Sequence, residues 1–224
     1  MKRLNIICEG QTEERFVNDI LAPHLSKYNV YPIARCWKKR GGTKGGGSSY
    51  DLVQNDIDKW ISQEGHDKNV YFTVMVDLYS FPKQGNTIYD EEVINTRDAK
   101  EKIKKLEEKM LKRTKNFHRF IPYIQLHEFE SLLFSDPEKL KNYFLDKNIQ
   151  VDQLIKETAN YKPEDINETP EGAPSKRLNK YLNYEKQKVV AGTYIANLIE
   201  IKKIKEMCPN FNAWLTKLEG ISNK

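Results

Sequence analysis

An uninterrupted run of apolar, aromatic and β-branched residues, VYFTVMV at 70–76, constrains the fold of this chain more than any other segment. Such a run predicts a buried β-strand. It ends at Asp77, whose carboxylate would need a partner, since burying an unpaired charge costs several kcal/mol. We therefore expect a strand that delivers a functional or anchoring carboxylate to its carboxyl end.

Strand and helix patterns alternate around this run. Further strands are expected near 3–8, 30–37 and 120–126, and the helices between them near 12–27, 50–63 and 92–112. Pro23 predicts a kink or an early end of the first helix, and Pro122 removes one hydrogen bond from the last strand. Strands joined by helical crossovers predict an α/β, Rossmann-like fold, with a mostly parallel sheet of about four strands flanked by helices.

The second part of the chain has helical patterns without clear strands. Helices are expected near 191–207 and 211–219. With 38% hydrophobic residues in 224, the chain can build a real core. We expect residues 1–135 to form the α/β core and residues 136–224 a helical C-terminal extension packed on it.

Composition excludes some classes of protein. No apolar run is long enough to span a membrane, and the N-terminus lacks the features of a signal peptide. Three cysteines without a CxxC spacing favour reduced thiols and a cytoplasmic location. The net charge of +5 is only mildly basic, and lysines scattered over solvated helices would give the same value.

Acidic or metal-binding side chains follow the predicted strands. In parallel α/β sheets, functional groups gather beyond the carboxyl ends of the strands. These ends carry Glu9, Asp77 and the HEFE segment with His127, Glu128 and Glu130. Oxygen ligands of this kind suit Mg²⁺ or Mn²⁺. In the alternative reading, Asp77 caps a helix or anchors a loop.

Two further features of these carboxylates stay open. Glu13, on the first turn of the predicted helix, can face Glu9 or simply complement the helix dipole. In HEFE, Glu128 and Glu130 share a face only if the segment is extended, whereas a helix would pair His127 with Glu130. The segment is not the HExxH zinc motif, because no second histidine follows at the required spacing.

Two loops carry basic residues. The glycine-rich segment 40–48 (RGGTKGGGS) lacks the order of a phosphate-binding P-loop. It is either a basic segment that contacts a nucleic-acid backbone or a flexible connector. In the second loop, 168–177 (ETPEGAPSKR), Ser175 is a candidate helix cap, and Lys176 and Arg177 can meet a phosphate or a carboxylate.

At these residues the chain resembles the Toprim superfamily of topoisomerases, primases and OLD-type nucleases. More closely, it resembles a bacterial Toprim-like family called domain of unknown function 4276. The resemblance covers most of the chain, through the segments ICEGQTEERFV, VDLYSFP, FIPYIQLHEFESLLF, ETPEGAPSKRL and CPNFNAWLTKL.

The resemblance implies roles for single residues. Glu9 matches the Toprim glutamate that assists acid–base chemistry or binds metal, and Glu13 resembles a second acidic position of OLD-type enzymes. Asp77 matches the first aspartate of a Mg²⁺-binding Asp-x-Asp pair, but Tyr79 stands where the second is expected. Glu128 or Glu130 can replace the missing carboxylate, or the site binds metal weakly or not at all.

Several functions follow from these features. The first is a Mg²⁺- or Mn²⁺-dependent nuclease acting on DNA or RNA, with metal ligands and catalytic groups among Glu9, Glu13, Asp77, Glu128, Glu130 and Lys176. By analogy with related Toprim proteins, it would serve an ABC- or SMC-like ATPase in anti-phage defence, with a homodimer as an open possibility. The alternative is a non-catalytic docking or regulatory module for such an ATPase. Nucleotidyl transfer and attack by Tyr79 are weaker options.

Overall fold

The apolar run at Val70 forms the long inner strand of a parallel sheet in the computed structural model, which describes residues 1–37, 49–166 and 172–223. The sheet order is β2-β1-β3-β4, and β5 also pairs with β3. All these pairings are parallel. The strands are β1 (Lys2–Cys8), β2 (Val30–Cys36), β3 (Val70–Asp77), β4 (Phe120–Ile121) and β5 (Ile124–Gln125).

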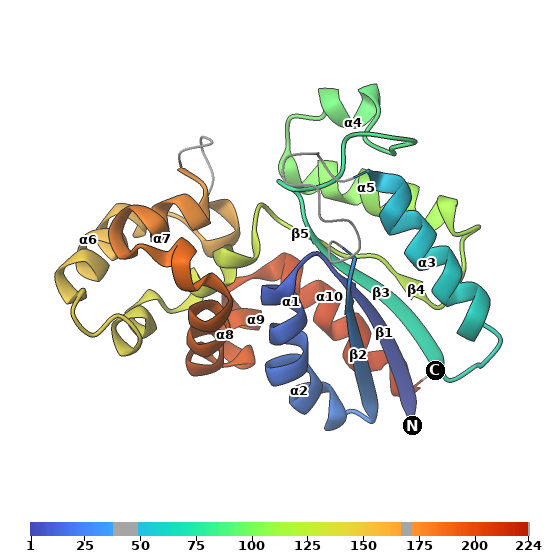
Figure 1. Cartoon of the computed structure of the whole chain (residues 1–224), viewed down its shortest axis with the longest axis horizontal. Helices are drawn as coiled ribbons and strands as arrows, with labels where there is room; N and C mark the ends of the chain where they lie inside the picture. Colours follow the sequence, from blue (N-terminus) through green and yellow to red (C-terminus); the bar gives the residue numbers. More distant parts are fainter. Residues whose placement is uncertain (38–48, 167–171, 224) are drawn as a thin grey trace.

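Helices cover both faces of the sheet, so the predicted fold class is confirmed (Figure 1). Leu4, Ile6 and Cys8 of β1 pack in one core with the C-terminal helices, whereas Ile7 packs in a second core with α3 and α5. This alternation follows from the two-residue period of a strand. The helices are α1 (Gln11–Phe16), α2 (Ala22–Ser26), α3 (Tyr50–Glu64), α4 (Glu91–Asn95), α5 (Ala99–Arg113), α6 (Asn148–Thr158), α7 (Pro174–Leu182), α8 (Lys188–Ile199), α9 (Ile201–Met207) and α10 (Pro209–Glu219).

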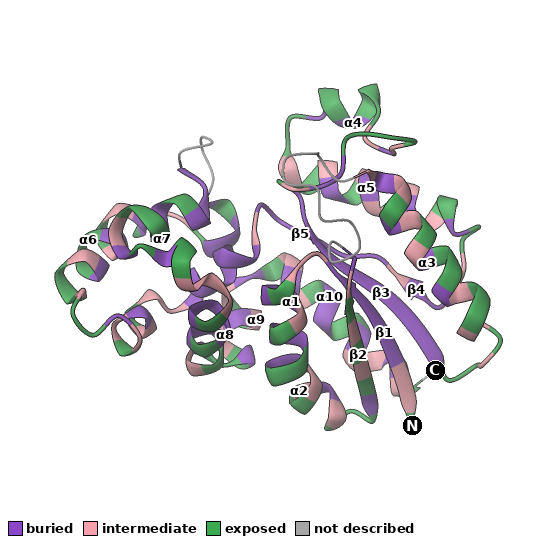
Figure 2. Ribbon diagram, in the orientation of Figure 1, coloured by how far each residue is buried: buried purple, intermediate pink, exposed green. Residues whose placement is uncertain are grey.

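The inner strands are more deeply buried than the edge strand. Every residue of β3 is buried, whereas burial in β2 alternates along the strand (Figure 2). Tyr31, Ile33 and Arg35 on β2 are exposed. The edge strand β2 is therefore only partly covered on the side from which these three residues project.

The first predicted helix continues past Pro23 by changing its winding. The π-helical turn Val17–Leu21 joins α1 to α2, and Pro23 lies within the first two positions of α2. A proline has no N–H to donate and its ring crowds the carbonyl one turn earlier. The wider turn just before Pro23 lets the helix continue where the sequence predicted a kink or an early end.

Three other predicted elements are divided. The helix expected near 92–112 is α4 and α5, because Asp98 accepts a hydrogen bond from the N–H of Glu101 and starts a new helix. The strand expected at 120–126 is β4 and β5, with Pro122 between them. The helix expected near 191–207 breaks at Glu200, whose φ is +68°.

No helix within the described ranges is both long and apolar enough to cross a membrane. The glycine-rich segment 40–48 and residues 168–171 of the second loop lie outside the described residues.

Candidate functional site

The ends of β1 and β3 lie side by side and bring Glu9 and Asp77 together. In the register of the two strands, Cys8 is opposite Met75. Glu9 follows Cys8, and its Oε2 accepts hydrogen bonds from the backbone N–H of Asp77 (3.2 Å) and from the Ser80 hydroxyl. The carboxylate of Glu9 thus spans the carboxyl ends of two neighbouring strands.

Asp77 is a buried carboxyl group with an unsatisfied oxygen. Its Oδ1 has no hydrogen-bond partner, and its side chain is not an N-cap of the helices described above. Burial raises the pKa of Asp77 well above its ordinary value, and the negative charges of Glu9, Glu13 and Glu130 raise it further. The structure therefore gathers several carboxyl groups around an oxygen that lacks a donor.

Glu13 joins this group from the first turn of α1. It is buried, and its Oε2 accepts the backbone N–H of Gly10 at 2.9 Å, as in a capping box. Burial raises the pKa of Glu13 to about 7, with further contributions from Glu9 and Glu130. Glu13 therefore caps its helix and faces the other carboxylates at the same time.

Glu128 and Glu130 point to different partners. Glu128 has extended backbone angles (φ −142°, ψ 156°) and precedes the 3₁₀ segment Phe129–Ser135, so HEFE does not open an α-helix. Glu128 accepts the backbone N–H (2.8 Å) and the hydroxyl (3.0 Å) of Ser175. Ser175 is thus not the cap of α7, whose N-cap is Ala173.

Glu130 is fully buried and forms an ion pair that the sequence did not reveal. Its Oε1 lies 3.1 Å from Nζ of Lys188 and accepts a hydrogen bond from the Tyr184 hydroxyl at 3.2 Å. Its Oε2 has no hydrogen-bond partner, and burial raises the pKa of Glu130. Oε1 of Glu130 therefore has both an ion-pair partner and a hydrogen-bond donor, whereas Oε2 has no hydrogen-bond donor.

Lys188 supplies a positive charge within the carboxylate cluster, which comprises Glu9, Glu13, Asp77 and Glu130. Burial alone lowers the pKa of Lys188, but the charges of Glu130, Asp77 and Glu13 raise it well above its ordinary value. The available signal was a lysine at the start of the otherwise uncharged segment KVVAGTYIANLI. Placing it beside Glu130 required the tertiary fold.

The remaining candidates lie at the edge of the cluster or outside it. Tyr79, which the resemblance to Toprim proteins aligns with a second aspartate, packs its ring 5.6 Å from that of His127. His127 is buried, and burial lowers its pKa to about 4. Lys176 is exposed on α7, next to the Ser175 that binds Glu128, and Arg177 instead forms an ion pair with Glu157.

The donor atoms of the cluster suit a hard divalent cation. Carboxylate oxygens are the preferred ligands of Mg²⁺ and Mn²⁺, and Asp77 and Glu130 each have a buried oxygen without a hydrogen bond. Over residues 1–37, 49–166 and 172–223, however, no three acidic, histidine or cysteine side chains converge closely enough to hold a metal as they stand. Binding would therefore require these side chains to draw together.

Comparison with known families identifies the chain. A family described as a domain of unknown function, DUF4276, matches residues 8–219. The chain belongs to this family. The match confirms the sequence-based resemblance to the DUF4276 family and includes each candidate residue from Glu9 to Lys188.

Solved structures and curated proteins were compared as well. The C-terminal region of the Xanthomonas campestris pv. campestris OLD protein is 14% identical, with a TM-score of 0.46 over 100% of this chain and 96% of that chain. The C-terminal region of the Burkholderia pseudomallei OLD protein is 12% identical, with a TM-score of 0.45 over 98% of this chain and 97% of that chain. No match was found among curated proteins.

Proposed function

We propose that this DUF4276 protein is a Mg²⁺- or Mn²⁺-dependent nuclease of the Toprim type, which hydrolyses phosphodiester bonds in DNA or RNA. The observation that carries the proposal is the buried Oδ1 of Asp77, which lacks a hydrogen bond and lies among carboxyl groups at the ends of two parallel strands. Crowding carboxylates costs free energy unless a cation compensates them. A divalent cation is the compensation that Toprim-like sequence motifs imply.

The residues around Asp77 divide the chemical roles. Asp77 and Glu9 would hold the metal together with Glu13 or Glu130, and the metal would polarise the phosphate and favour ionisation of a water molecule. Where Glu130 completes the metal site, Glu13 is left to accept and return a proton. Lys188 contributes a positive charge beside a developing phosphate charge.

Glu128 and Lys176 have supporting roles in this proposal, outside the carboxylate cluster. Glu128 is held by Ser175 and orients the start of α7. The neighbouring Lys176 is exposed and can contact a nucleic-acid phosphate. Both remain secondary to Glu9 and Asp77, because neither touches the unsatisfied oxygen of Asp77.

A specific observation favours a second candidate function, a non-catalytic docking or regulatory module. Lys188 already compensates one oxygen of Glu130, and Tyr79 stands in the place of a metal-binding aspartate. On this proposal the Toprim-like scaffold serves to dock an ABC- or SMC-like ATPase. In either case the reduced thiols of Cys8, Cys36 and Cys208 suit a reducing cytoplasm, and the biological setting we propose is ATPase-linked defence against phage.

Calorimetric titration with Mn²⁺ and a nuclease assay on DNA and RNA test the proposal. Wild type is compared with Glu9→Gln/Asp77→Asn and with the control Asp146→Asn/Glu206→Gln, which removes the same charge from exposed positions. We expect Mn²⁺ binding and cleavage by wild type and by the control, and loss of both in the double variant. The double variant should stay folded by circular dichroism, because it removes charge from a crowded, buried cluster.

Each alternative outcome has a definite meaning. Cleavage that survives Glu9→Gln/Asp77→Asn contradicts the assignment of the site. A folded wild-type protein that binds no Mn²⁺ and cleaves neither nucleic acid contradicts the nuclease and favours the docking module.

A further inference from the structure

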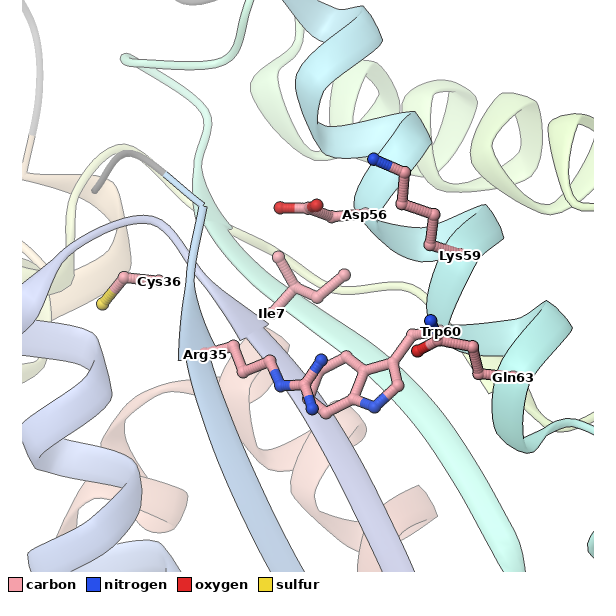
Figure 3. Close-up of a pocket in the computed structure, with 7 residues that line it drawn as sticks. All are labelled: Ile7, Arg35, Cys36, Asp56, Lys59, Trp60 and Gln63. Carbon is pink, nitrogen blue, oxygen red and sulfur yellow. The ribbon is translucent and has the colours of Figure 1, made fainter. Parts of the chain in front are cut away.

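A small pocket lies between the edge strand β2 and helix α3, close to the carboxyl ends of the strands. Its volume is about 120 Å³. Figure 3 shows Arg35 from β2 reaching toward Trp60 from α3, with Ile7 of β1 between the two elements. The lining residues are Ile7, Arg35, Cys36, Asp56, Lys59, Trp60 and Gln63.

Trp60 holds the guanidinium of Arg35 in place. The guanidinium carbon of Arg35 lies 4.1 Å from the centre of the Trp60 ring, within the range of a cation–π interaction. Trp60 is itself buried, and its indole N–H donates to Glu64 at 2.9 Å. Stacking uses the flat face of a guanidinium and leaves the N–H groups along its edge available as donors. The arginine is therefore oriented before any ligand arrives.

The pocket has more positive than negative charge. Within the described ranges, no carboxylate forms an ion pair with Arg35 or with the exposed Lys59. The nearby Glu64 carboxylate already accepts hydrogen bonds from Asn5 and Trp60 and pairs with Arg3 at 2.9 Å. Asp56 is the one acidic residue among those that line the pocket. Two cations and one carboxylate line the pocket, and this balance favours an anionic ligand.

Size and position restrict which anion would bind. Pockets for whole small-molecule ligands usually measure about 300–1,000 Å³, so this one suits a single phosphate group better than a nucleoside. Arg35 is opposite Ile7 in the register of the sheet, two residues before Glu9. At about 3.3 Å per residue, Arg35 lies about two residues, or about 7 Å, before Glu9 along the strand direction, on the neighbouring strand.

We infer that this pocket binds a backbone phosphate of a nucleic-acid strand that continues to the carboxylate cluster. Arg35 is the principal contact, Lys59 is a second contact and Trp60 is a positioning residue. The inference rests on the proposed nuclease function and adds to it the path of the strand, across the β2 edge beside α3.

Binding can be measured without cleavage. Fluorescence anisotropy with labelled single-stranded DNA and RNA of one sequence, in a chelator and over a series of salt concentrations, gives the affinity and its salt dependence. The variants are Arg35→Gln and Arg35→Gln/Lys59→Gln, all at exposed positions. Lys27→Gln/Lys202→Gln is the matched control, because both lysines are exposed and line a different pocket, near His24.

We expect the pocket variants to weaken binding several-fold and to lower the slope of log K against log[salt] by about 0.7 for each lost phosphate contact. The control should keep the wild-type slope. Trp60→Phe, which keeps an aromatic ring in the core, should weaken binding less than Arg35→Gln.

The outcomes separate this inference from the proposed function. Wild-type binding with equal slopes in the pocket variants and the control overturns the pocket assignment and leaves the nuclease proposal standing. Failure of the folded wild-type protein to bind either nucleic acid overturns both. A reduced slope with DNA alone, or with RNA alone, supports the pocket and identifies the polymer.

Discussion

The pair formed by Lys188 and Glu130 is the residue-scale feature with the clearest energetic consequence. Glu130 is fully buried, and Lys188 is its ion-pair partner at 3.1 Å. Removing one member of a buried pair leaves an uncompensated charge and typically costs about 3–5 kcal/mol. About a third of the Lys188 side chain is exposed, so we expect a cost at the lower end of this range. Lys188→Met should lower the free energy of unfolding, measured with urea, by about 3 kcal/mol.

A second variant tests whether that cost comes from the Glu130 carboxylate, which Lys188→Met leaves without its ion-pair partner. Glu130→Gln/Lys188→Met removes both charges, and we expect it to recover most of the lost stability. Equal destabilisation of the single and double variants would instead mean that the cost does not come from the unpaired charge of Glu130. Lys186→Met, at an exposed neighbouring position, controls for the general effect of losing a lysine.

At this scale the sequence predicted part of the site. Glu9 and Asp77 could be found because each follows an apolar strand, and parallel strand ends meet at one edge of a sheet. Lys188 and Tyr184 could not be found in the same way, because they come from helices far along the chain. Ser80 lies in a loop, and nothing in its neighbours predicts that its hydroxyl donates to Glu9.

At the scale of elements, α5 is tied to β5 by the half-buried carboxyl group of Glu107. Glu107 accepts the backbone N–H of Ile124 at 3.0 Å, and burial raises its pKa to about 7. In the unfolded chain a glutamate ionises near pH 4.3, so between about pH 4.3 and 7 the folded protein binds more protons than the unfolded one. The contribution of Glu107 to stability is therefore lost as pH rises through this range.

Glu107→Gln should remove this pH dependence. Glutamine keeps the hydrogen-bond acceptor for Ile124 and cannot ionise. We expect variant and wild type to be equally stable near pH 4, and the variant to be more stable by up to about 3 kcal/mol at pH 8. Urea unfolding of variant and wild type between about pH 4 and 8 measures this difference in stability, and Glu108→Gln, at an exposed position, is the control. A stability difference that does not change with pH would show that Glu107 is ionised in the folded protein.

Boundaries of elements were harder to predict than their presence. The patterns near 3–8, 50–63 and 70–76 predicted β1, α3 and β3 almost to the residue, because a continuous apolar run marks each strand and a single helical period marks α3. The division of α4 from α5 depends on Asp98 competing as a cap, which periodicity does not register. The passage of a helix through Pro23 depends on the π-helical turn before it.

One of the two hydrophobic cores is built from both parts of the chain, because it joins β1 with the C-terminal helices. The sequence predicted an α/β core at 1–135 and a helical extension at 136–224. Periodicity alone cannot tell whether such helices form a separate domain or cover one face of the sheet. Trp214 of α10 stacks on Tyr123, with ring centres 4.3 Å apart and planes 9° apart, and donates to the Thr73 hydroxyl at 3.0 Å. The C-terminal part thus covers one face of the sheet.

This arrangement predicts that residues 1–135 do not fold by themselves. Without α10, the face of the sheet that carries Tyr123 and Thr73 would lose its cover, and α1 would lose the contact between Phe16 and Phe211. In the full chain, Trp214→Ala should cost about 3–5 kcal/mol and Trp214→Phe clearly less, because the smaller ring still fills part of the space. Chemical unfolding of both variants and of the 1–135 fragment measures these effects. Cooperative unfolding of the fragment would contradict the prediction and make 136–224 a separable domain. A fragment that does not unfold cooperatively would mean that the helical layer is needed to hold Asp77 and Glu9 at the ends of a stable sheet. The candidate site would then depend on the whole chain.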